Sequence, residues 1–207
     1  MTLVAWISLA FAAWTLWAIL CAWLDEGPRD GLVGGLVWRG LQIYGRLVHH
    51  LKVEGRELLP ERDEVGPLVV VCNHTAGVDP LLVQAACGFE VRWMMALDMK
   101  TRRWGFVWDW IGVIFVDRAG GDANGARDAV RHRREGGVLG IFPEGRIERP
   151  QRRLLPFQPG VGMIIRRTGA DVLLVSIEGT PTMPTAWGSL WISSRARVRF
   201  LERVSYA

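Results

Sequence analysis

The stretch from residue 69 to residue 80 constrains the fold more than any other part of the chain. It reads Val-Val-Val-Cys-Asn-His-Thr-Ala-Gly-Val-Asp-Pro. The apolar, mostly β-branched residues at its start predict a buried strand, and the polar residues after them predict a turn. Asp79 followed by Pro80 favours the start of a helix, with Asp79 as the N-cap and Pro80 in the first turn.

His74 and Asp79 lie in this predicted turn with four residues between them. Open α/β sheets usually place their chemistry in the loops at the carboxyl ends of strands. A carboxylate that holds an imidazole in one tautomer leaves the other ring nitrogen available as a base. The pair has a purely structural explanation as well, because the aspartate can serve only as a cap and the histidine only as a turn residue.

Predicted strands and helices alternate through most of the chain. Strands are predicted at residues 68–72, 90–96, 112–117, 138–142, 172–177 and 195–204, and helices at 80–87, 123–135 and 159–168. This alternation predicts an α/β fold with a largely parallel β-sheet flanked by helices. Residues 52–67 are polar and contain glycine and proline, so we predict turns there.

The chain begins with an uncharged segment, Thr2 to Leu24. As a helix it is about 34 Å long, enough to cross the hydrocarbon core of a bilayer. A signal peptide is disfavoured, because no basic residue precedes the segment and no small-x-small cleavage site follows it. We therefore predict a membrane anchor, although a helix in one leaflet or a long buried helix gives a similar pattern. All basic residues follow the segment, which predicts the rest of the protein on the cytoplasmic side of the cytoplasmic membrane.

Residues 31–51 predict an amphipathic helix. Apolar residues recur there at spacings of three and four, while another face carries Arg39, Gln42, Arg46 and His50. Such a helix suits an anionic membrane surface, although a helix packed on the domain core has the same pattern. We predict that residues 1–51 form an N-terminal membrane region and residues 52–207 the main domain.

Charge and composition narrow the classes of partner. The net charge of +4 fits nucleic acid, anionic lipid or a phosphorylated substrate. Basic and aromatic residues interleave between Lys100 and Trp110, which suits base stacking or a membrane interface, and the predicted anchor favours the interface. Because no nucleic-acid motif and no Gly-rich phosphate loop is present, we expect neither nucleic acid nor nucleotides. The three cysteines match no metal-binding spacing, so we expect no metal site.

Polar residues follow three of the predicted strands. They are His74 and Asp79 after the first strand, Arg118 after the third, and Glu144, Gly145 and Arg146 after the fourth. Because the carboxyl ends of parallel strands lie along one edge of a sheet, these residues can converge on one cleft.

The segments that carry these residues resemble the motifs of the glycerophospholipid acyltransferases, a family typified by lysophosphatidic acid acyltransferase. The similar segments are residues 73–80 for the His-x4-Asp motif, 112–118 for a strand ending in arginine, 142–145 for Phe-Pro-Glu-Gly, 155–160 for Leu-Pro-Phe-x-x-Gly and 172–179 for a hydrophobic strand. In the last segment Leu174 stands where the family usually has proline. The motifs occur in the family's order over about residues 68–180, which makes 52–207 the acyltransferase domain.

The resemblance implies transfer of a fatty acyl group from a thioester, acyl-CoA or acyl carrier protein, to the hydroxyl of a lysophospholipid. The leading acceptor is 1-acyl-glycerol-3-phosphate, which gives phosphatidic acid. The resemblance makes His74 the base that activates the hydroxyl and Asp79 the carboxylate that orients it. It places the acceptor at Arg118 and at the Glu144, Gly145 and Arg146 turn, and it requires no cofactor and no covalent acyl-enzyme.

Two alternatives to this function stay open. The first is an acyltransferase for another lyso-lipid, such as a lyso-ornithine lipid, because the motifs do not identify the acceptor. The second is a membrane subunit that keeps the fold without catalysis, which predicts a broken histidine and aspartate pair. The donor, the length of the acyl chain and the oligomeric state are not indicated by the sequence.

Overall fold

The computed structural model describes residues 2–117, 123–150 and 153–206. Within these ranges a sheet of seven strands has the order β1-β7-β6-β2-β5-β3-β4. The strands are β1 (Lys52–Glu54), β2 (Leu68–Cys72), β3 (Val91–Ala96), β4 (Ile114–Val116), β5 (Val138–Ile141), β6 (Asp171–Glu178) and β7 (Arg197–Val204). The helices are α1 (Leu3–Asp25), α2 (Leu32–Leu47), α3 (Asp79–Ala86), α4 (Gly105–Ile111), α5 (Ala123–Arg134) and α6 (Pro159–Thr168).

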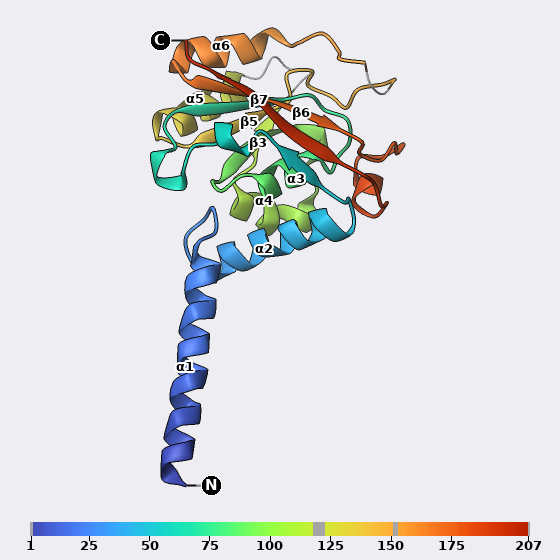
Figure 1. Cartoon of the computed structure of the whole chain (residues 1–207). Helices are drawn as coiled ribbons and strands as arrows, with labels where there is room; N and C mark the ends of the chain where they lie inside the picture. Colours follow the sequence, from blue (N-terminus) through green and yellow to red (C-terminus); the bar gives the residue numbers. More distant parts are fainter. Residues whose placement is uncertain (1, 118–122, 151–152, 207) are drawn as a thin grey trace.

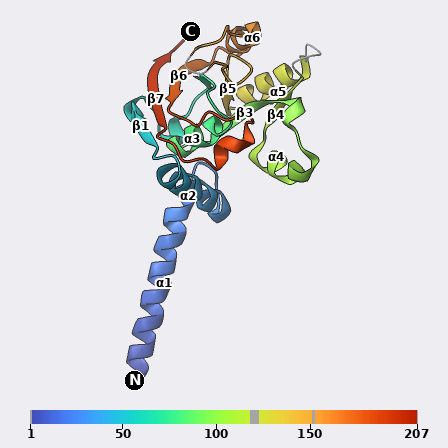
Figure 2. The ribbon, with the colours of Figure 1, turned by 90° about the vertical axis from the view of Figure 1, so that its right-hand side faces the viewer.

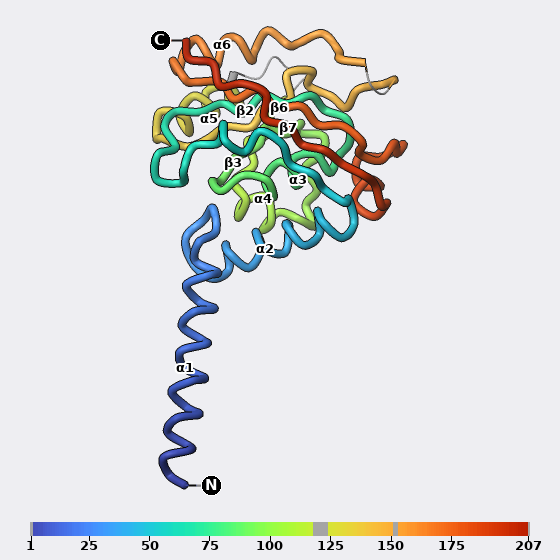
Figure 3. The backbone as a smooth tube through the Cα atoms, viewed as in Figure 1, coloured from blue at the N-terminus to red at the C-terminus, as the bar shows by residue number. Residues whose placement is uncertain are grey.

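Five neighbouring strands of the sheet are parallel, which confirms the predicted α/β class. Strand β2 pairs in parallel with β5 on one side and β6 on the other, and β3 continues this arrangement to β4. The exception lies at the other edge, where β7 runs antiparallel to β6 and carries β1 with it. The backbone trace follows this reversal from β6 into β7 (Figure 3).

The short strand β1 corrects the sequence prediction, which placed turns throughout residues 52–67. Lys52 to Glu54 pair with Arg197 to Arg199 at the edge of the sheet. Two 3-10 turns, Arg56–Leu58 and Arg62–Glu64, follow before β2. Three residues are too few to show an alternating pattern, so only the neighbouring strand reveals the pairing.

The core lies on both faces of the sheet around β2, all five residues of which are buried. Val70 and Cys72 join the cluster that contains Leu82 of α3. Val69 joins the opposite cluster, to which α5 contributes Ala129 and α6 contributes Ile164. A strand covered on both faces needs apolar residues at every position, which explains the unbroken run of the sequence.

The apolar helix α1 projects away from the domain (Figures 1 and 2). None of its residues is buried, and its length and composition are sufficient to cross a membrane. A close approach of backbones sets the junction with α2, because a Cβ at Gly35 would lie 1.5 Å from the carbonyl oxygen of Leu24. The predicted helix is therefore confirmed, while its role as an anchor and the domain division at residue 51 stay predictions.

Helix α2 has one side on the domain and one side exposed. The Trp38 indole donates to the carbonyl of Cys87 at the end of α3, and Tyr44 packs against the core. Leu36, Ile43 and Leu47 are exposed. The two interpretations of the amphipathic pattern are thus not exclusive, since one face packs on the domain and the other exposes apolar side chains.

Candidate active site

The turn after β2 is fixed to the neighbouring strand by Asn73. Its amide nitrogen donates to the carbonyl of Ile177 over 3.0 Å, and its oxygen accepts the N–H of Ile177 over 2.8 Å. Both bonds join the ends of β2 and β6. This double clamp stops the strand and directs the next residue, His74, out of the sheet.

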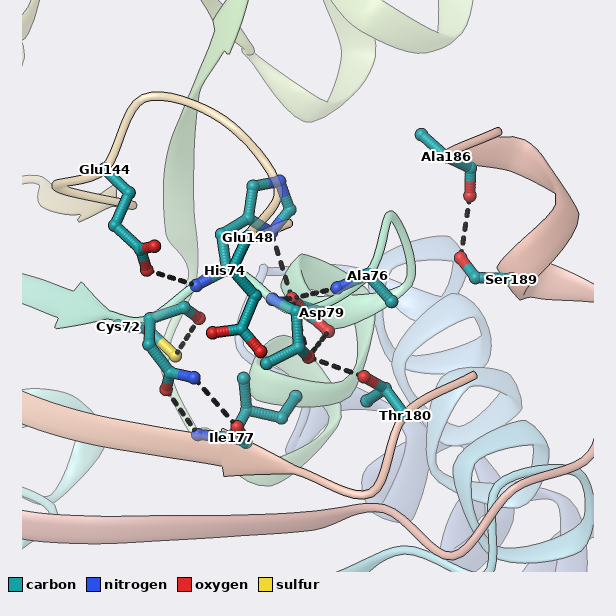
Figure 4. Close-up of polar contacts among 12 residues, drawn as sticks. Cys72, His74, Ala76, Asp79, Glu144, Glu148, Ile177, Thr180, Ala186 and Ser189 are labelled. Carbon is teal, nitrogen blue, oxygen red and sulfur yellow. Dashed lines mark hydrogen bonds and ion pairs between the residues drawn. The ribbon is translucent and has the colours of Figure 1, made fainter. Parts of the chain in front are cut away.

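His74 and Asp79 meet as the sequence predicted. The Nδ1 atom of His74 lies 2.9 Å from Oδ2 of Asp79. The Asp79 side chain has no exposed surface, whereas 17% of the His74 side chain is exposed. A buried carboxylate therefore holds an imidazole that solvent reaches in part (Figure 4).

Asp79 is not the N-cap of α3, which corrects the prediction. The cap position belongs to Val78, and Asp79 is the first residue of the helix. Its Oδ2 turns back and accepts the backbone N–H groups of Thr75 over 2.6 Å and Ala76 over 2.8 Å. The carboxylate thus closes its own turn, because the chain between residues 74 and 79 curls around it.

A hydroxyl pair completes the surroundings of Asp79. The Thr75 hydroxyl donates to Oδ1 of Asp79 over 3.1 Å and lies 2.5 Å from the hydroxyl of Thr180, just after β6. Burying a carboxylate is costly unless donors surround it, and here a ring N–H, two backbone N–H groups and a hydroxyl do so. With Oδ2 as its acceptor, Nδ1 carries the hydrogen and Nε2 is left as the basic nitrogen.

Stacked aromatic rings hold the other side of His74. The imidazole lies 4.0 Å from the ring of Phe142 at an interplanar angle of 15°. Phe142 in turn stacks on Trp93 at 4.7 Å. His74 follows the end of β2 and Phe142 follows the end of β5, whereas Trp93 lies within β3, so three neighbouring strands contribute one ring each. The sequence predicted no role for Phe142 or Trp93, although Phe142 is the first residue of the Phe-Pro-Glu-Gly motif and this position could have indicated one.

Glu144 joins the two sides of the site through backbone contacts. Only 1% of Glu144 is exposed. Its Oε1 accepts the N–H of His74 over 3.0 Å, and its Oε2 accepts the N–H of Leu155 over 2.9 Å. The carboxylate therefore supports the histidine from behind and ties the segment after the turn to it.

The remaining predicted site residues fall in three different places. Gly145 has a φ of +68°, which suits glycine, and its N–H donates to the carbonyl of Phe142 to close the turn. The side chain of Arg146 is exposed directly after this turn. Arg118 lies outside the described residues, so its position relative to His74 stays a prediction.

Arg149 is a contact that the sequence did not indicate. Its guanidinium donates to the carbonyl of Met183 over 2.7 Å and approaches the carbonyl of Thr75 at 3.5 Å. The N–H of the preceding Glu148 donates to the carbonyl of His74 over 2.7 Å. The loop after β5 is thus bound to the histidine turn along its length, and arginine does so because its planar head carries five donors.

An open groove of about 1160 Å³ extends as far as Thr75 of the histidine turn, although His74 and Asp79 are not among its lining residues. Thr75, Asn73 and Thr180 line its polar end. Leu154, Phe157, Leu174 and Leu201 also belong to its lining and make part of it apolar. The groove therefore combines a polar region beside the histidine turn with an apolar region.

Among the described residues, neither a reactive thiol nor a metal cluster accompanies the pair. Burial raises the pKa of the Cys72 thiol well above its usual range and that of Cys87 to about 12, which disfavours a reactive thiolate in either. Within residues 2–117, 123–150 and 153–206, no group of three or more histidine, cysteine, aspartate or glutamate side chains is arranged to hold a metal ion.

Comparison with known proteins settles the family. The family model described as Acyltransferase matches residues 50–187, more than half of the chain. The chain belongs to the acyltransferase family. The family predicted from the motifs is therefore confirmed, and residues 73–79 and 142–145 of this acyltransferase both lie inside the matched region.

Two individual proteins are similar to this acyltransferase. It is 31% identical over 132 residues to a curated 1-acyl-sn-glycerol-3-phosphate acyltransferase of Borreliella burgdorferi, a match that covers 62% of this chain and 51% of the relative. The chain thus spans about half the length of that relative. The solved structure of the 1-acyl-sn-glycerophosphate acyltransferase PlsC from Thermotoga maritima matches with a TM-score of 0.66 and 23% identity, covering 82% of this chain and 69% of the other. This second likeness confirms the fold.

Proposed function

We propose that this protein transfers a fatty acyl group from a thioester to the hydroxyl of a lysophospholipid, with 1-acyl-glycerol-3-phosphate as the leading acceptor and phosphatidic acid as the product. One observation carries the proposal, namely the His74 ring held 2.9 Å from the buried Asp79 carboxylate. Membership of the family and the printed activities of the two similar proteins support the same chemistry.

His74 would act as the general base. Its Nε2 takes the proton of the acceptor hydroxyl while the oxygen attacks the carbonyl carbon of the thioester. The tetrahedral intermediate then collapses, the C–S bond breaks, and the imidazolium returns the proton to the leaving thiolate. Asp79 stabilises the imidazolium between these steps and does not itself carry the proton, so no acyl-enzyme and no cofactor is needed.

The turn around Asp79 restricts which donors can stabilise the oxyanion. The N–H groups of Thr75 and Ala76 donate to Asp79. The N–H of Asp79 donates to the carbonyl of Ala76. Gly77 is partly exposed between them, so its N–H is the best candidate in this turn.

The acceptor phosphate would meet the arginines that follow the strand ends. Arg146 is exposed next to the 142–145 turn, which suits a bidentate contact with phosphate oxygens. Arg118 keeps its predicted role at the same phosphate. Glu144 would act by positioning His74 instead of binding the acceptor hydroxyl, because both of its oxygens accept backbone N–H groups.

An acyl chain would occupy the apolar part of the groove. The side chains of Leu154, Phe157 and Leu201 line it. Burial of each methylene contributes about 0.8 kcal/mol, so a fatty acyl chain gains several kcal/mol from such a surface. The thioester donor is acyl-CoA or acyl carrier protein, both of them anionic, and the net charge of +4 favours their approach.

The exposed helix α1 supports a place in the cytoplasmic membrane. It carries no charge from Leu3 to Leu24 and has no buried residue. The first basic residue, Arg29, follows it, so the domain is proposed on the cytoplasmic side. A lysophospholipid resides in the bilayer, and an anchor keeps the site beside its acceptor.

Lipid mass spectrometry with a panel of acceptors tests the proposed function. The purified protein receives acyl-CoA or acylated acyl carrier protein and one of three acceptors: 1-acyl-glycerol-3-phosphate, a lysophospholipid with a head group, or a lyso-ornithine lipid. We expect phosphatidic acid with the first acceptor and its loss in His74→Ala. Product from another acceptor alone would reassign the substrate, and equal turnover in His74→Ala would remove the histidine from the mechanism.

A further inference from the structure

Exposed apolar side chains gather on two short segments that the proposed chemistry does not use. One is α4 with the 3-10 turn before it, Arg102–Trp104, and the other is the 3-10 turn Trp187–Leu190 (η5) with the residues after it. We call their exposed members the apolar rim: Trp104, Phe106, Trp110, Trp187, Trp191 and Ile192. Phe106 is 73% exposed and Trp191 is 82% exposed. Large apolar surfaces in water mark a site of interaction.

Arg29 connects the rim to the end of the apolar helix. The guanidinium lies 4.6 Å above the Trp110 ring and donates to the Trp110 carbonyl. It also forms an ion pair with Glu90. Arg29 stands four residues after the last residue of α1, Asp25. Helix α4 therefore lies at the level where α1 ends.

Two further contacts connect α4 with η5 and η5 with α2. The rings of Trp108 and Trp187 lie 5.9 Å apart. The Tyr44 hydroxyl of α2 donates to the carbonyl of Leu190 over 2.7 Å. Contacts thus connect the α1–α2 segment to α4, α4 to η5, and η5 to α2. Figures 1 and 2 show α2 and α4 on the side of the domain from which α1 projects.

The chemistry of this side fits an anionic lipid surface. Lys100, Arg102 and Arg103 are exposed directly before α4, among the aromatic residues. Indole rings and long basic side chains together suit the headgroup layer, where rings sit among the lipids and cations meet phosphates. The exposed Leu36 and Ile43 of α2 extend the same surface. Because this exposed surface is continuous with α1, we favour a bilayer over a soluble protein as its binding partner.

The rim also borders the histidine turn. A Cβ at Gly77 would lie 2.3 Å from the carbonyl oxygen of Ala186, the residue before η5. Figure 4 shows Ala186 and Ser189 of this segment beside the turn that carries Ala76. A lipid that leaves the bilayer at η5 therefore arrives next to the turn between His74 and Asp79.

We infer that the apolar rim of α4 and η5 rests in the headgroup layer of an anionic bilayer and delivers the lipid acceptor to His74. This inference rests on the proposed function for the acceptor, while the contact with lipid stands independently of it. The rim gives the domain a second attachment besides α1. With two attachments the side of the domain that carries α4 and η5 is held against the bilayer, whereas one helix alone would leave the domain free to turn.

A fluorophore at single positions tests the contact with lipid. Cys72 and Cys87 are buried, so in full-length protein with Cys21→Ser an added cysteine is the accessible thiol. Phe106→Cys and Trp191→Cys are labelled with nitrobenzoxadiazole in vesicles of phosphatidylethanolamine and phosphatidylglycerol that contain nitroxide-headgroup lipid. Glu135→Cys, at an exposed position directly after α5, is the matched control.

We expect the lipid to quench both rim labels at least about twofold more than the control, since a label at the interface contacts headgroups directly. Quenching should weaken when phosphatidylcholine replaces phosphatidylglycerol. Equal quenching at all three positions would overturn the inference and leave the rim in water or on a soluble partner.

Kinetics test delivery of the acceptor. For Phe106→Ser with Trp191→Ser, we expect the apparent KM for a long-chain acceptor in vesicles to rise about fivefold, with kcat within about twofold. A short-chain, water-soluble acceptor should change little, and the control Tyr206→Ser removes an exposed ring elsewhere. An equal KM increase for both acceptors, or none, would contradict delivery. If the wild-type protein acylates no acceptor, the proposed function fails while the quenching result still decides the contact with lipid.

Discussion

The histidine turn buries a charged group, whereas the apolar rim exposes apolar groups to solvent. In the turn, a carboxylate is fully buried and four donors surround it. On the rim, aromatic side chains are exposed, Phe106 and Trp191 most of all. Both arrangements are costly alone, the first because buried charge loses hydration and the second because apolar surface orders water.

The two regions differ in what can offset the free-energy cost of this burial or exposure. The cost of burying Asp79 is offset inside the protein, so the turn is complete without a partner and holds one geometry. The cost of exposing Phe106 and Trp191 is not offset inside the described chain. Burial of these side chains against an external surface would therefore be favourable. The proposed catalytic turn and the proposed membrane contact would thus offset their solvation costs differently, the first inside the protein and the second against an external surface.

Removal of the base has the largest expected effect. For His74→Gln we expect kcat/KM to fall about a thousandfold, because general base catalysis contributes factors of this order. The free energy of unfolding should fall by only about 1 kcal/mol, since the variant loses the stacking on Phe142 but its amide can still donate to Asp79. Steady-state kinetics and denaturant unfolding in detergent measure the two quantities. A variant that loses stability as much as activity would show that the ring is mainly structural.

Removal of the carboxylate should damage both catalysis and stability. Asp79→Ala leaves the N–H groups of Thr75 and Ala76 buried without their acceptor, and we expect a loss of about 3 kcal/mol in the free energy of unfolding. Asp79→Asn, which keeps an acceptor oxygen, should lose less stability but still lose activity. Similar stability in the wild type and Asp79→Ala would contradict the account of the turn as an offset buried charge.

The contact between the histidine turn and the segment before η5 can be tested at Gly77. In Gly77→Ala the new methyl group meets the backbone of Ala186 at 2.3 Å, so η5 must shift. We expect a loss of about 2 kcal/mol, as for other overpacked sites, together with a raised KM. In the control Gly162→Ala no atom lies within 4 Å of the new methyl, and the helix should gain up to about 1 kcal/mol. Unchanged kinetics in Gly77→Ala would separate the rim from the site.

The smallest expected effect is a pH dependence of the free energy of unfolding. It arises at His49, which lies between Tyr44 of α2 and Ser194 in the segment after η5. His49 is buried, with Nε2 2.8 Å from the Tyr44 hydroxyl and Nδ1 2.8 Å from the Ser194 hydroxyl. Burial lowers the pKa of His49, the nearby His50 lowers it further, and Asp79 opposes them. Because the folded state then binds fewer protons than the unfolded state, stability should fall as the pH drops below about 6.5.

Unfolding at pH 7.5, 6.5 and 5.5 measures this loss. Burial also lowers the pKa of His132, which acts in the same direction. His49→Gln should flatten the profile in part, and His49→Gln with His132→Gln should flatten it further. A profile that stays equally steep in the double variant would attribute the acid sensitivity to other groups.

Much of the fold follows from local pattern. Helix α6 spans Pro159–Thr168, as predicted, because proline at its start and glycine after its end mark both boundaries. Strand β2 spans the predicted residues for a similar reason, since an unbroken apolar run is visible in sequence. Helix α4 was not predicted, because residues 105–111 mix aromatic and acidic residues without a clear helical period.

The site was predictable by residue type but not by contact. His74 and Asp79 could be selected from the sequence because a histidine and an aspartate with four residues between them form a recurring motif. The role of Glu144 was not visible, because its partners are backbone N–H groups of residues 70 positions before it and 11 positions after it. Trp93 gave no signal, since an aromatic residue in a strand is ordinarily part of the core.

The sequence by itself determined most of the strands and helices along the chain, the apolar N-terminal helix and the candidate pair of His74 and Asp79, because each depends on neighbouring residues in the chain. Only the tertiary structure decided that Asp79 closes its own turn, that Glu144 supports the histidine from behind, and that α4 and η5 gather beside the end of α1. These depend on distances between residues far apart in sequence, and such distances are fixed by the packing of the sheet and its helices.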